Sequence, residues 1–154
     1  MTTRTFSEGL NHFATRLLRV FQGTVGPGAP LVLCADDDPA IRQLCAAALS
    51  KAGYGTDEAS DGREVLEKIK SHRYAAILLD LTMPYVHGTT LLNVLEREQP
   101  DVLARVIVLT GAPEGVLEGL SKSVSAVLRK PVQLDLLLST VNDCCSDDQT
   151  IVSR

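Results

Sequence analysis

The chain has 154 residues, a net charge of −4, 45% hydrophobic residues and 22% charged residues. These values are typical of one globular domain with a sizeable core. The negative charge disfavours non-specific nucleic-acid binding, and no apolar stretch reaches the roughly 20 residues that a membrane-spanning helix needs. The N-terminus also lacks the continuous apolar segment and the small-residue cleavage site of a secretory signal peptide.

Residues 1–30 differ from the rest of the chain. Apolar side chains recur every three or four positions from Phe6 to Phe21, which predicts an amphipathic helix followed by a Gly/Pro-rich linker. The segment carries a charge of +2, which leaves −6 for the remainder. The helix is expected to pack back on its own domain or to pair with a second copy in a homodimer, and binding to a membrane surface is a third option.

Residues 31–145 alternate short apolar runs with helical patterns. The predicted strands are 31–35, 54–59, 75–79, 105–109 and 126–128; the predicted helices lie between Pro39 and Gly53, from Gly62 through Ile69, and over 89–98, 113–123 and 134–141. Five strands alternating with five helices predict an α/β domain with a parallel sheet covered on both faces. The polar residues 146–154 are expected to form a disordered tail.

The four cysteines show no CxxC spacing. Cys34 lies inside an apolar run and Cys45 on an apolar helix face, so both are interpreted as small core residues in a reducing compartment. Cys144 and Cys145 precede the polar tail and are interpreted as a frayed helix end.

Four of the apolar runs end in polar groups. Asp36, Asp37 and Asp38 follow the first run, and Asp80, Thr110 and Lys130 follow three later ones. Because the carboxyl ends of parallel strands lie at one edge of a sheet, these groups are expected to meet where such folds place their sites. Neighbouring carboxylates repel one another, and Mg²⁺ with oxygen ligands is the natural counter-ion.

This set of groups fits phosphoryl transfer. Asp80 could act as a nucleophile that forms an acyl phosphate. Lys130 could neutralise phosphoryl oxygens on the side away from the metal, and Thr110 could donate a hydrogen bond to one of them.

Four segments carry a resemblance to a known family: LVLCADDDPAIRQL, AAILLDLTMPYVHG, VIVLTG and VLRKP. Over residues 31–145 the chain resembles the receiver domain of bacterial two-component response regulators. The resemblance implies a flavodoxin-like five-stranded sheet in the order 2-1-3-4-5. It also implies that the domain accepts a phosphoryl group from a histidine kinase or a histidine phosphotransfer protein, with Mg²⁺ as the cofactor.

The resemblance also implies residue roles, position by position. Asp80 matches the phosphoacceptor, Asp36 and Asp37 the acidic pair that holds Mg²⁺ (with Asp37 favoured as the direct ligand), Thr82 the residue whose backbone carbonyl is a further ligand, Thr110 the switch hydroxyl and Lys130 the lysine of the site. The Lys130–Pro131 bond would be cis, and Asp38 would start the helix that follows.

The chain departs from the family pattern at Val127, where a Phe or Tyr is usual. That ring moves inward when the threonine follows the phosphoryl group, whereas a valine can move little. The segment between Thr110 and Lys130 is also short and rich in Gly and Pro. These departures predict intact phosphorylation chemistry with an altered output surface.

The function expected from the resemblance is that of a cytoplasmic signalling domain that catalyses only its own phosphorylation and dephosphorylation. No DNA-binding or enzymatic module is expected after residue 145, so output is expected to pass through protein contacts, unless the chain is a piece of a larger hybrid kinase or regulator. One alternative is an adaptor that works without phosphorylation. A phosphatase of the haloacid dehalogenase type is disfavoured because its Asp-x-Asp-x-Thr motif is not present around Asp80.

Overall fold

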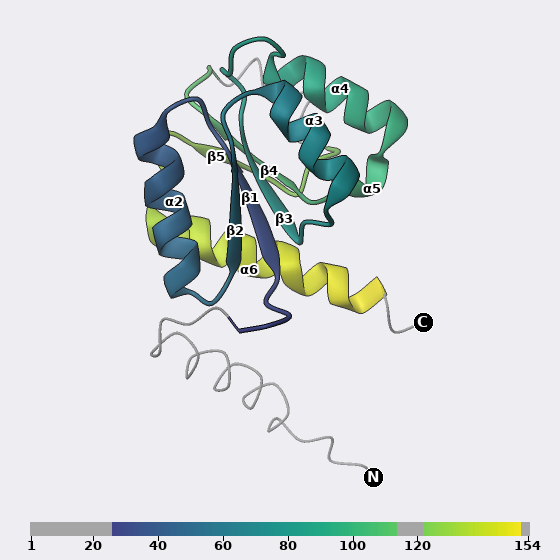
Figure 1. The fold of residues 1–154 in the computed structure, drawn as a ribbon. Helices are drawn as coiled ribbons and strands as arrows, with labels where there is room; N and C mark the ends of the chain where they lie inside the picture. Colours follow the sequence, from purple (N-terminus) through teal and green to yellow (C-terminus); the bar gives the residue numbers. More distant parts are fainter. Residues whose placement is uncertain (1–25, 114–121, 152–154) are drawn as a thin grey trace.

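The computed structural model describes residues 26–113 and 122–151 and contains one sheet of five parallel strands. The strands are β1 (Leu31–Ala35), β2 (Gly55–Ala59), β3 (Ala76–Asp80), β4 (Val106–Thr110) and β5 (Ala126–Arg129). Their order is β2-β1-β3-β4-β5, which confirms the predicted flavodoxin-like topology (Figure 1). All four strand pairings are parallel.

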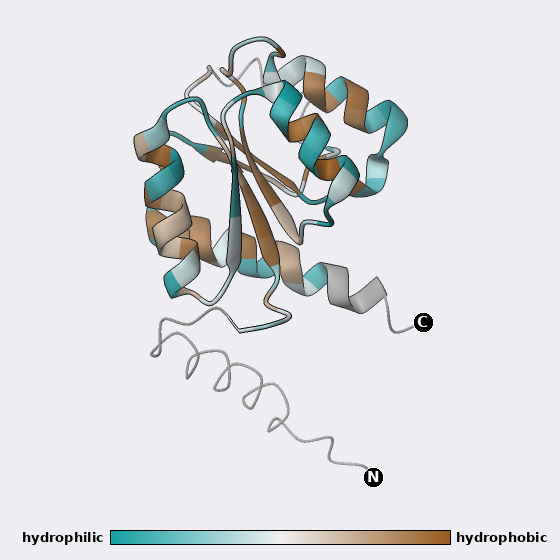
Figure 2. Ribbon diagram, in the orientation of Figure 1, coloured by the Kyte–Doolittle hydropathy of each residue, from teal (hydrophilic) through white to brown (hydrophobic). Residues whose placement is uncertain are grey.

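Helices cover both faces of the sheet (Figure 1). They are α2 (Pro39–Lys51), α3 (Gly62–Ser71), α4 (Gly88–Glu98), the short α5 (Pro100–Leu103) and α6 (Leu134–Ile151). One core layer lies between the sheet and α2 with α6, and the other lies between the sheet and α3 with α4 and α5. Figure 2 shows the hydrophobic strands enclosed between the two helix layers.

The central strands are apolar throughout because both of their faces are buried. In β1, Val32 and Cys34 belong to the core layer under α2 and α6, whereas Leu33 and Ala35 belong to the layer under α3 and α4. Such strands bury successive side chains on opposite faces, so a continuous apolar run is needed rather than an alternating one. This burial fixes the register and therefore the position at which each strand ends.

The edge strand β2 is polar, as predicted, and a partly buried hydrogen-bond network attaches it to its neighbours. Asp57 Oδ1 accepts a hydrogen bond from Lys68 Nζ, and Asp57 Oδ2 accepts one from the Tyr74 hydroxyl, each at 2.7 Å. Burial opposes ionisation of Asp57, but these hydrogen bonds outweigh it and lower the pKa of the carboxyl. Burial and the Asp57 charge raise the pKa of Tyr74.

Local signals explain where α2 begins and ends. The Asp38 side chain accepts a hydrogen bond from the Ala40 amide, and Pro39 occupies the first turn, so Asp38 starts the helix as expected. Gly53 follows the helix with a φ of 88°, a left-handed conformation that glycine adopts without a steric penalty.

The C-terminal helix differs from the prediction. α6 continues to Ile151, so the residues from 146 to 151 that were expected to be disordered are helical. Cys144 and Cys145 are each 5% exposed and belong to the core layer under α2 and α6, so the interpretation as a frayed end was wrong. Their burial extends the apolar stripe of the helix beyond Val141.

Two smaller differences have local causes. Leu44, expected on the inner face of α2, is 54% exposed because Cys45 and Leu49 form the narrow buried stripe of that helix. Pro100 follows the end of α4, as predicted, but it also occupies the first turn of α5, which was not predicted. The helix expected over 113–123 and the one expected within 1–30 fall mainly outside the described residues.

Candidate functional site

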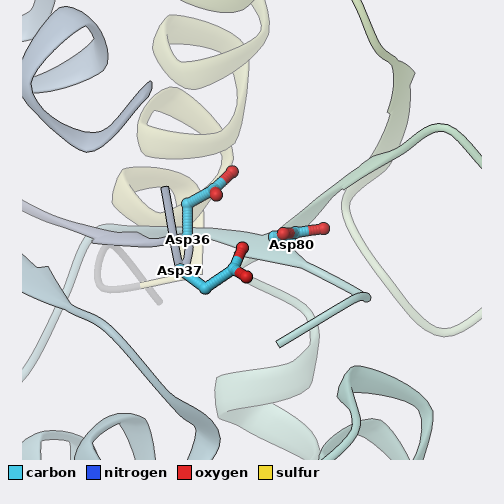
Figure 3. A group of neighbouring side chains, drawn as sticks. All are labelled: Asp36, Asp37 and Asp80. Carbon is cyan, nitrogen blue, oxygen red and sulfur yellow. The ribbon is translucent and has the colours of Figure 1, made fainter. Parts of the chain in front are cut away.

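The residues predicted for the site meet at the carboxyl edge of the sheet. Asp36 and Asp37 follow β1, Asp80 is the last residue of β3, and each of the three offers a carboxylate oxygen within 4.8 Å of the others (Figure 3). Thr110 ends β4, and Lys130 follows β5. The sheet topology therefore brings together groups that are up to 94 positions apart in the sequence.

Asp36 is a buried acid, 3% exposed, whose two oxygens are both engaged. Oδ1 accepts a hydrogen bond from the Asp38 amide at 2.9 Å, and Oδ2 accepts one from Lys130 Nζ at 2.8 Å. Burial raises the pKa of Asp36, although Lys130 opposes the rise. Burial alone would lower the pKa of Lys130, but the hydrogen bond to Asp36 and the charge of Asp80 raise it overall, so the ammonium is held in its charged form.

The two oxygens of Asp80 have different surroundings. Oδ1 accepts hydrogen bonds from the amide and the hydroxyl of Thr82, each at 3.0 Å. Oδ2 is buried without a hydrogen bond and lies 3.4 Å from Lys130 Nζ. A buried carboxylate oxygen with unused acceptor capacity is costly unless a cation or another group engages it.

Asp37 is exposed, and no hydrogen bond to its carboxylate is formed by the residues that the structure describes. Its backbone is held by Arg42, which donates to the carbonyl oxygens of Asp36 at 2.7 Å and of Asp37 at 3.3 Å. Arg42 also pairs with Glu58 on β2 at 3.1 Å. The sequence reasoning missed this arginine, whose signal is a basic residue one helical turn after the Asp38 cap.

Thr110 and Lys130 are connected through the backbone. The Lys130 amide donates to the Thr110 carbonyl at 2.9 Å, and the Lys130–Pro131 bond is cis, as expected. The Thr110 side chain is 1% exposed, and its hydroxyl oxygen accepts a hydrogen bond from the Ala112 amide at 2.9 Å. Val127 pairs with Val108 in the sheet and is half-buried against the α3–α4 core layer.

This geometry can bind a hard cation and engage an anionic group beside it. The acidic groups Asp36, Asp37 and Asp80 supply oxygen ligands, and Lys130 supplies a fixed positive charge next to them. A sequence profile of the response regulator receiver domain matches residues 32–142. The chain belongs to the response regulator receiver family.

Individual relatives agree with this assignment. The receiver is 33% identical over 108 residues to the response regulator MprA of Mycolicibacterium vanbaalenii, an alignment that covers 70% of this chain and 47% of MprA. It is 31% identical over 106 residues to the sensor protein EvgS of Escherichia coli K12, which covers 69% of this chain and 9% of EvgS. The chain therefore matches about half of one curated relative and a small part of the other.

Solved structures have the same fold. The receiver domain of the Francisella response regulator 1452 superposes with a TM-score of 0.70 at 34% identity, covering 77% of this chain and 98% of that one. The chemotaxis response regulator CheY4 of Vibrio cholerae superposes with a TM-score of 0.67 at 29% identity, covering 75% and 98% of the two chains. In the part of the receiver that the structure describes, no helix has both the length and the apolarity needed to cross a membrane.

Proposed function

We propose that this receiver accepts a phosphoryl group on Asp80 from a phosphohistidine donor, with Mg²⁺ as cofactor, and signals through protein contacts in the cytoplasm. The donor would be a histidine kinase or a histidine phosphotransfer protein. The observation that carries the proposal is Asp80 Oδ2, a buried carboxylate oxygen without a hydrogen bond beside two acids and a lysine. None of the four cysteines is in a disulfide, which is consistent with a reducing compartment.

The two oxygens of Asp80 suit different roles in the transfer. Thr82 holds Oδ1 through two hydrogen bonds, which orients the carboxylate and leaves a lone pair of Oδ2 available. Oδ2 would attack the phosphorus atom of a phosphohistidine whose other ring nitrogen carries a proton. The phosphorus–nitrogen bond would break, and its electron pair would return to the imidazole nitrogen, which leaves the ring neutral. The products are an acyl phosphate on Asp80 and a neutral histidine on the donor.

The acidic residues fit a Mg²⁺ ion. The direct ligands would be the carboxylates of Asp37 and Asp80 and the backbone carbonyl of Thr82. The Asp37 carboxylate is exposed and has no hydrogen bond from the described residues. Both oxygens of Asp36 already accept hydrogen bonds, so Asp36 would act mainly by its charge and through bound water. When bound, Mg²⁺ neutralises negative charge on the transferred oxygens.

Lys130 and Thr110 would stabilise the phosphoryl oxygens that the metal does not reach. Lys130 Nζ already lies within 3.4 Å of Asp80 Oδ2, so its charge is in place before the phosphoryl group arrives. The Thr110 hydroxyl oxygen accepts from Ala112, which leaves its proton available for donation to a phosphoryl oxygen. Val127 lacks the ring that would move inward when Thr110 follows the phosphoryl group, which supports an altered output surface.

The proposal is tested by intact-mass measurement after incubation with Mg²⁺ and acetyl phosphate. The mass is expected to increase by one phosphoryl group, and the increase should be absent with EDTA and in Asp80→Asn. Asp38→Asn is the matched control and should still gain the phosphoryl group. It removes one negative charge, as Asp80→Asn does, at the residue next to the acidic pair, and asparagine can still cap α2. An adduct that survives Asp80→Asn would contradict Asp80 as the acceptor. Absence of the adduct with acetyl phosphate and also with phosphorylated histidine kinases would exclude phosphotransfer and favour the phosphorylation-independent adaptor.

A homodimer through residues 1–30 is also proposed on the strength of the amphipathic pattern alone. Light scattering on the full chain and on a chain lacking residues 1–28 would measure it. A dimer that becomes a monomer after the deletion is the expected result, and a monomer in both cases would exclude it.

A further inference from the structure

The loop between β3 and α4 carries a large aromatic side chain in a backbone conformation that favours glycine. The Val86 amide donates to the Pro84 carbonyl at 2.9 Å, which closes a three-residue γ-turn around Tyr85, whose φ is 68°. A bulky residue rarely adopts this φ because its Cβ crowds the backbone. The Tyr85 side chain is 75% exposed, so burial in its own domain does not offset the strain.

The residue stacked on Tyr85 is also unfavourable for stability where it stands. The guanidinium of Arg63 lies 4.1 Å from the centre of the Tyr85 ring. Arg63 is in the first turn of α3, where a positive charge opposes the helix dipole. Within residues 26–113 and 122–147, no carboxylate forms an ion pair with it. Two adjacent side chains are thus placed against local preference and exposed together.

The loop is held firmly beside the phosphoacceptor. Gly88 donates to the Leu81 carbonyl at 3.1 Å, so the loop leaves and re-enters the fold next to Asp80. A Cβ on Gly62 would lie 2.6 Å from the Val86 carbonyl oxygen, which shows how closely the start of α3 packs on the loop. Tyr85 follows Asp80 by five residues, so their Cα atoms are separated by at most about 18 Å.

We propose that Tyr85 and Arg63 form a contact point for the protein that donates the phosphoryl group. The donor would present an apolar side chain to the Tyr85 ring and a carboxylate to Arg63. Asp80 is 1% exposed at the carboxyl edge, so a protein that brings phosphohistidine to it must cover the surrounding loops. A small phosphodonor reaches Asp80 without touching the loop tip. The inference rests on the proposed function of Asp80.

The test compares two kinds of donor with the full chain. Acetyl phosphate with Mg²⁺ is the small donor. The protein donors are the autophosphorylated cytoplasmic cores of the histidine kinases of the source organism. The kinase that transfers its phosphoryl group fastest to the unmodified protein is used for the comparison. Arg63→Glu and Tyr85→Gly are each expected to lower kcat/KM for the protein donor at least about tenfold, mainly through KM. Their rates with acetyl phosphate should equal that of the unmodified protein.

Both variants are chosen so that misfolding cannot imitate the effect. Glutamate is favourable in the first turn of a helix, and glycine is favourable at a φ of 68°, so neither melting temperature should fall. Arg97→Glu, the same charge reversal on the exposed last turn of α4, is the matched control and should transfer normally. Transfer to the unmodified protein should slow as ionic strength rises, and transfer to Arg63→Glu should depend on salt less.

Several outcomes would overturn the inference. One is that the protein donor phosphorylates the unmodified protein and both variants at the same rate. Another is that the variants lose as much rate with acetyl phosphate as with the protein donor. The third is that no kinase phosphorylates the unmodified protein faster than acetyl phosphate does. If the unmodified protein takes no phosphoryl group from acetyl phosphate or from any kinase, the proposed function itself fails, which separates the two conclusions.

Discussion

Lys130 is expected to be a major source of stability in the metal-free receiver, because its charge lies beside two buried carboxylates. At an effective dielectric constant of about 20, a charge 2.8 Å from Asp36 Oδ2 and 3.4 Å from Asp80 Oδ2 gains about 6 and about 5 kcal/mol before desolvation is subtracted. Desolvation of the ions opposes most of this gain. Removal of the ammonium leaves two buried carboxylates with no positive charge beside them. The free-energy cost of these unpaired charges determines how much a substitution of Lys130 destabilises the fold.

The substitution Lys130→Met keeps the length of the apolar part of the side chain and removes the charged ammonium. The cost of a stranded carboxylate is limited by the cost of protonating it, which for an ordinary pKa near 3.9 is about 4 kcal/mol at pH 7 and about 1.5 kcal/mol at pH 5. We therefore expect the free energy of unfolding to fall by about 3–4 kcal/mol at pH 7 in EDTA, in line with broken buried ion pairs.

The direction of the pH dependence follows from linkage. Without the ammonium, the folded-state pKa of Asp36 rises further above its unfolded value, so the folded state binds more protons than the unfolded state. The destabilisation should therefore grow as pH rises above the unfolded pKa and should shrink as pH falls toward it. Urea unfolding followed by circular dichroism at pH 7 and pH 5 measures both values.

Two further variants make the test specific. Lys130→Met combined with Asp36→Asn removes one of the stranded charges and should recover a substantial part of the lost stability at pH 7. Lys51→Met removes an exposed lysine at the end of α2 and should cost less than about 1 kcal/mol. A loss below about 1 kcal/mol for Lys130→Met at pH 7, or a loss of the same size at pH 5, would refute the reasoning.

Four other substitutions test the hydrogen bonds and the packing around the sheet. Tyr74→Phe removes the hydroxyl that donates to Asp57 and should lower the free energy of unfolding by about 1.5–3 kcal/mol in urea titrations. Asp57→Asn should lower stability at pH 7, and because the folded pKa of Asp57 lies below its unfolded value, the difference from the unmodified protein should shrink as pH falls through that folded pKa. Gly88→Ala would place a Cβ 2.5 Å from the Leu81 Cα, so the free energy of unfolding should fall by more than about 2 kcal/mol in the same assay. Gly111→Ala is the control: its Cβ would have no atom within 4 Å, so the free energy of unfolding should change by less than about 1 kcal/mol.

Each of these has a result that would contradict it. If Tyr74→Phe is harmless, the hydroxyl is not the partner that holds Asp57, and the double variant with Asp57→Asn should then show additive losses. Equal effects of Gly88→Ala and Gly111→Ala would mean that the loop shifts freely to admit a methyl group.

The sequence predicted the sheet and most of the site because burial makes both visible as patterns. Central strands buried on two faces must be apolar throughout, so the first polar residue after each run marks the strand end. Asp36, Asp80 and Thr110 were placed at the correct edge by this reasoning alone. The polar edge strand β2 and the Asp38 cap were predicted on equally local grounds.

What the sequence did not predict depends on distances through space. The hydrogen bond between Lys130 and Asp36 joins residues 94 positions apart, and no local pattern encodes it. The hydrogen bonds from Arg42 to two carbonyl groups depend on the path of the backbone between β1 and α2. The length of α6 was missed because its burial beyond Val141 relies on two cysteines that are followed at once by polar residues.

The four cysteine thiols can report local unfolding of this protein. Cys34, Cys45, Cys144 and Cys145 all lie in the core layer under α2 and α6, and none exceeds 6% exposure. Burial also raises the pKa of Cys34 to about 12, so its thiolate is scarce even when a reagent is near. Alkylation in dilute reagent therefore reports how readily α2 or α6 detaches from the sheet. Opening of the opposite core layer is not detected, because no described residue of that layer is a cysteine.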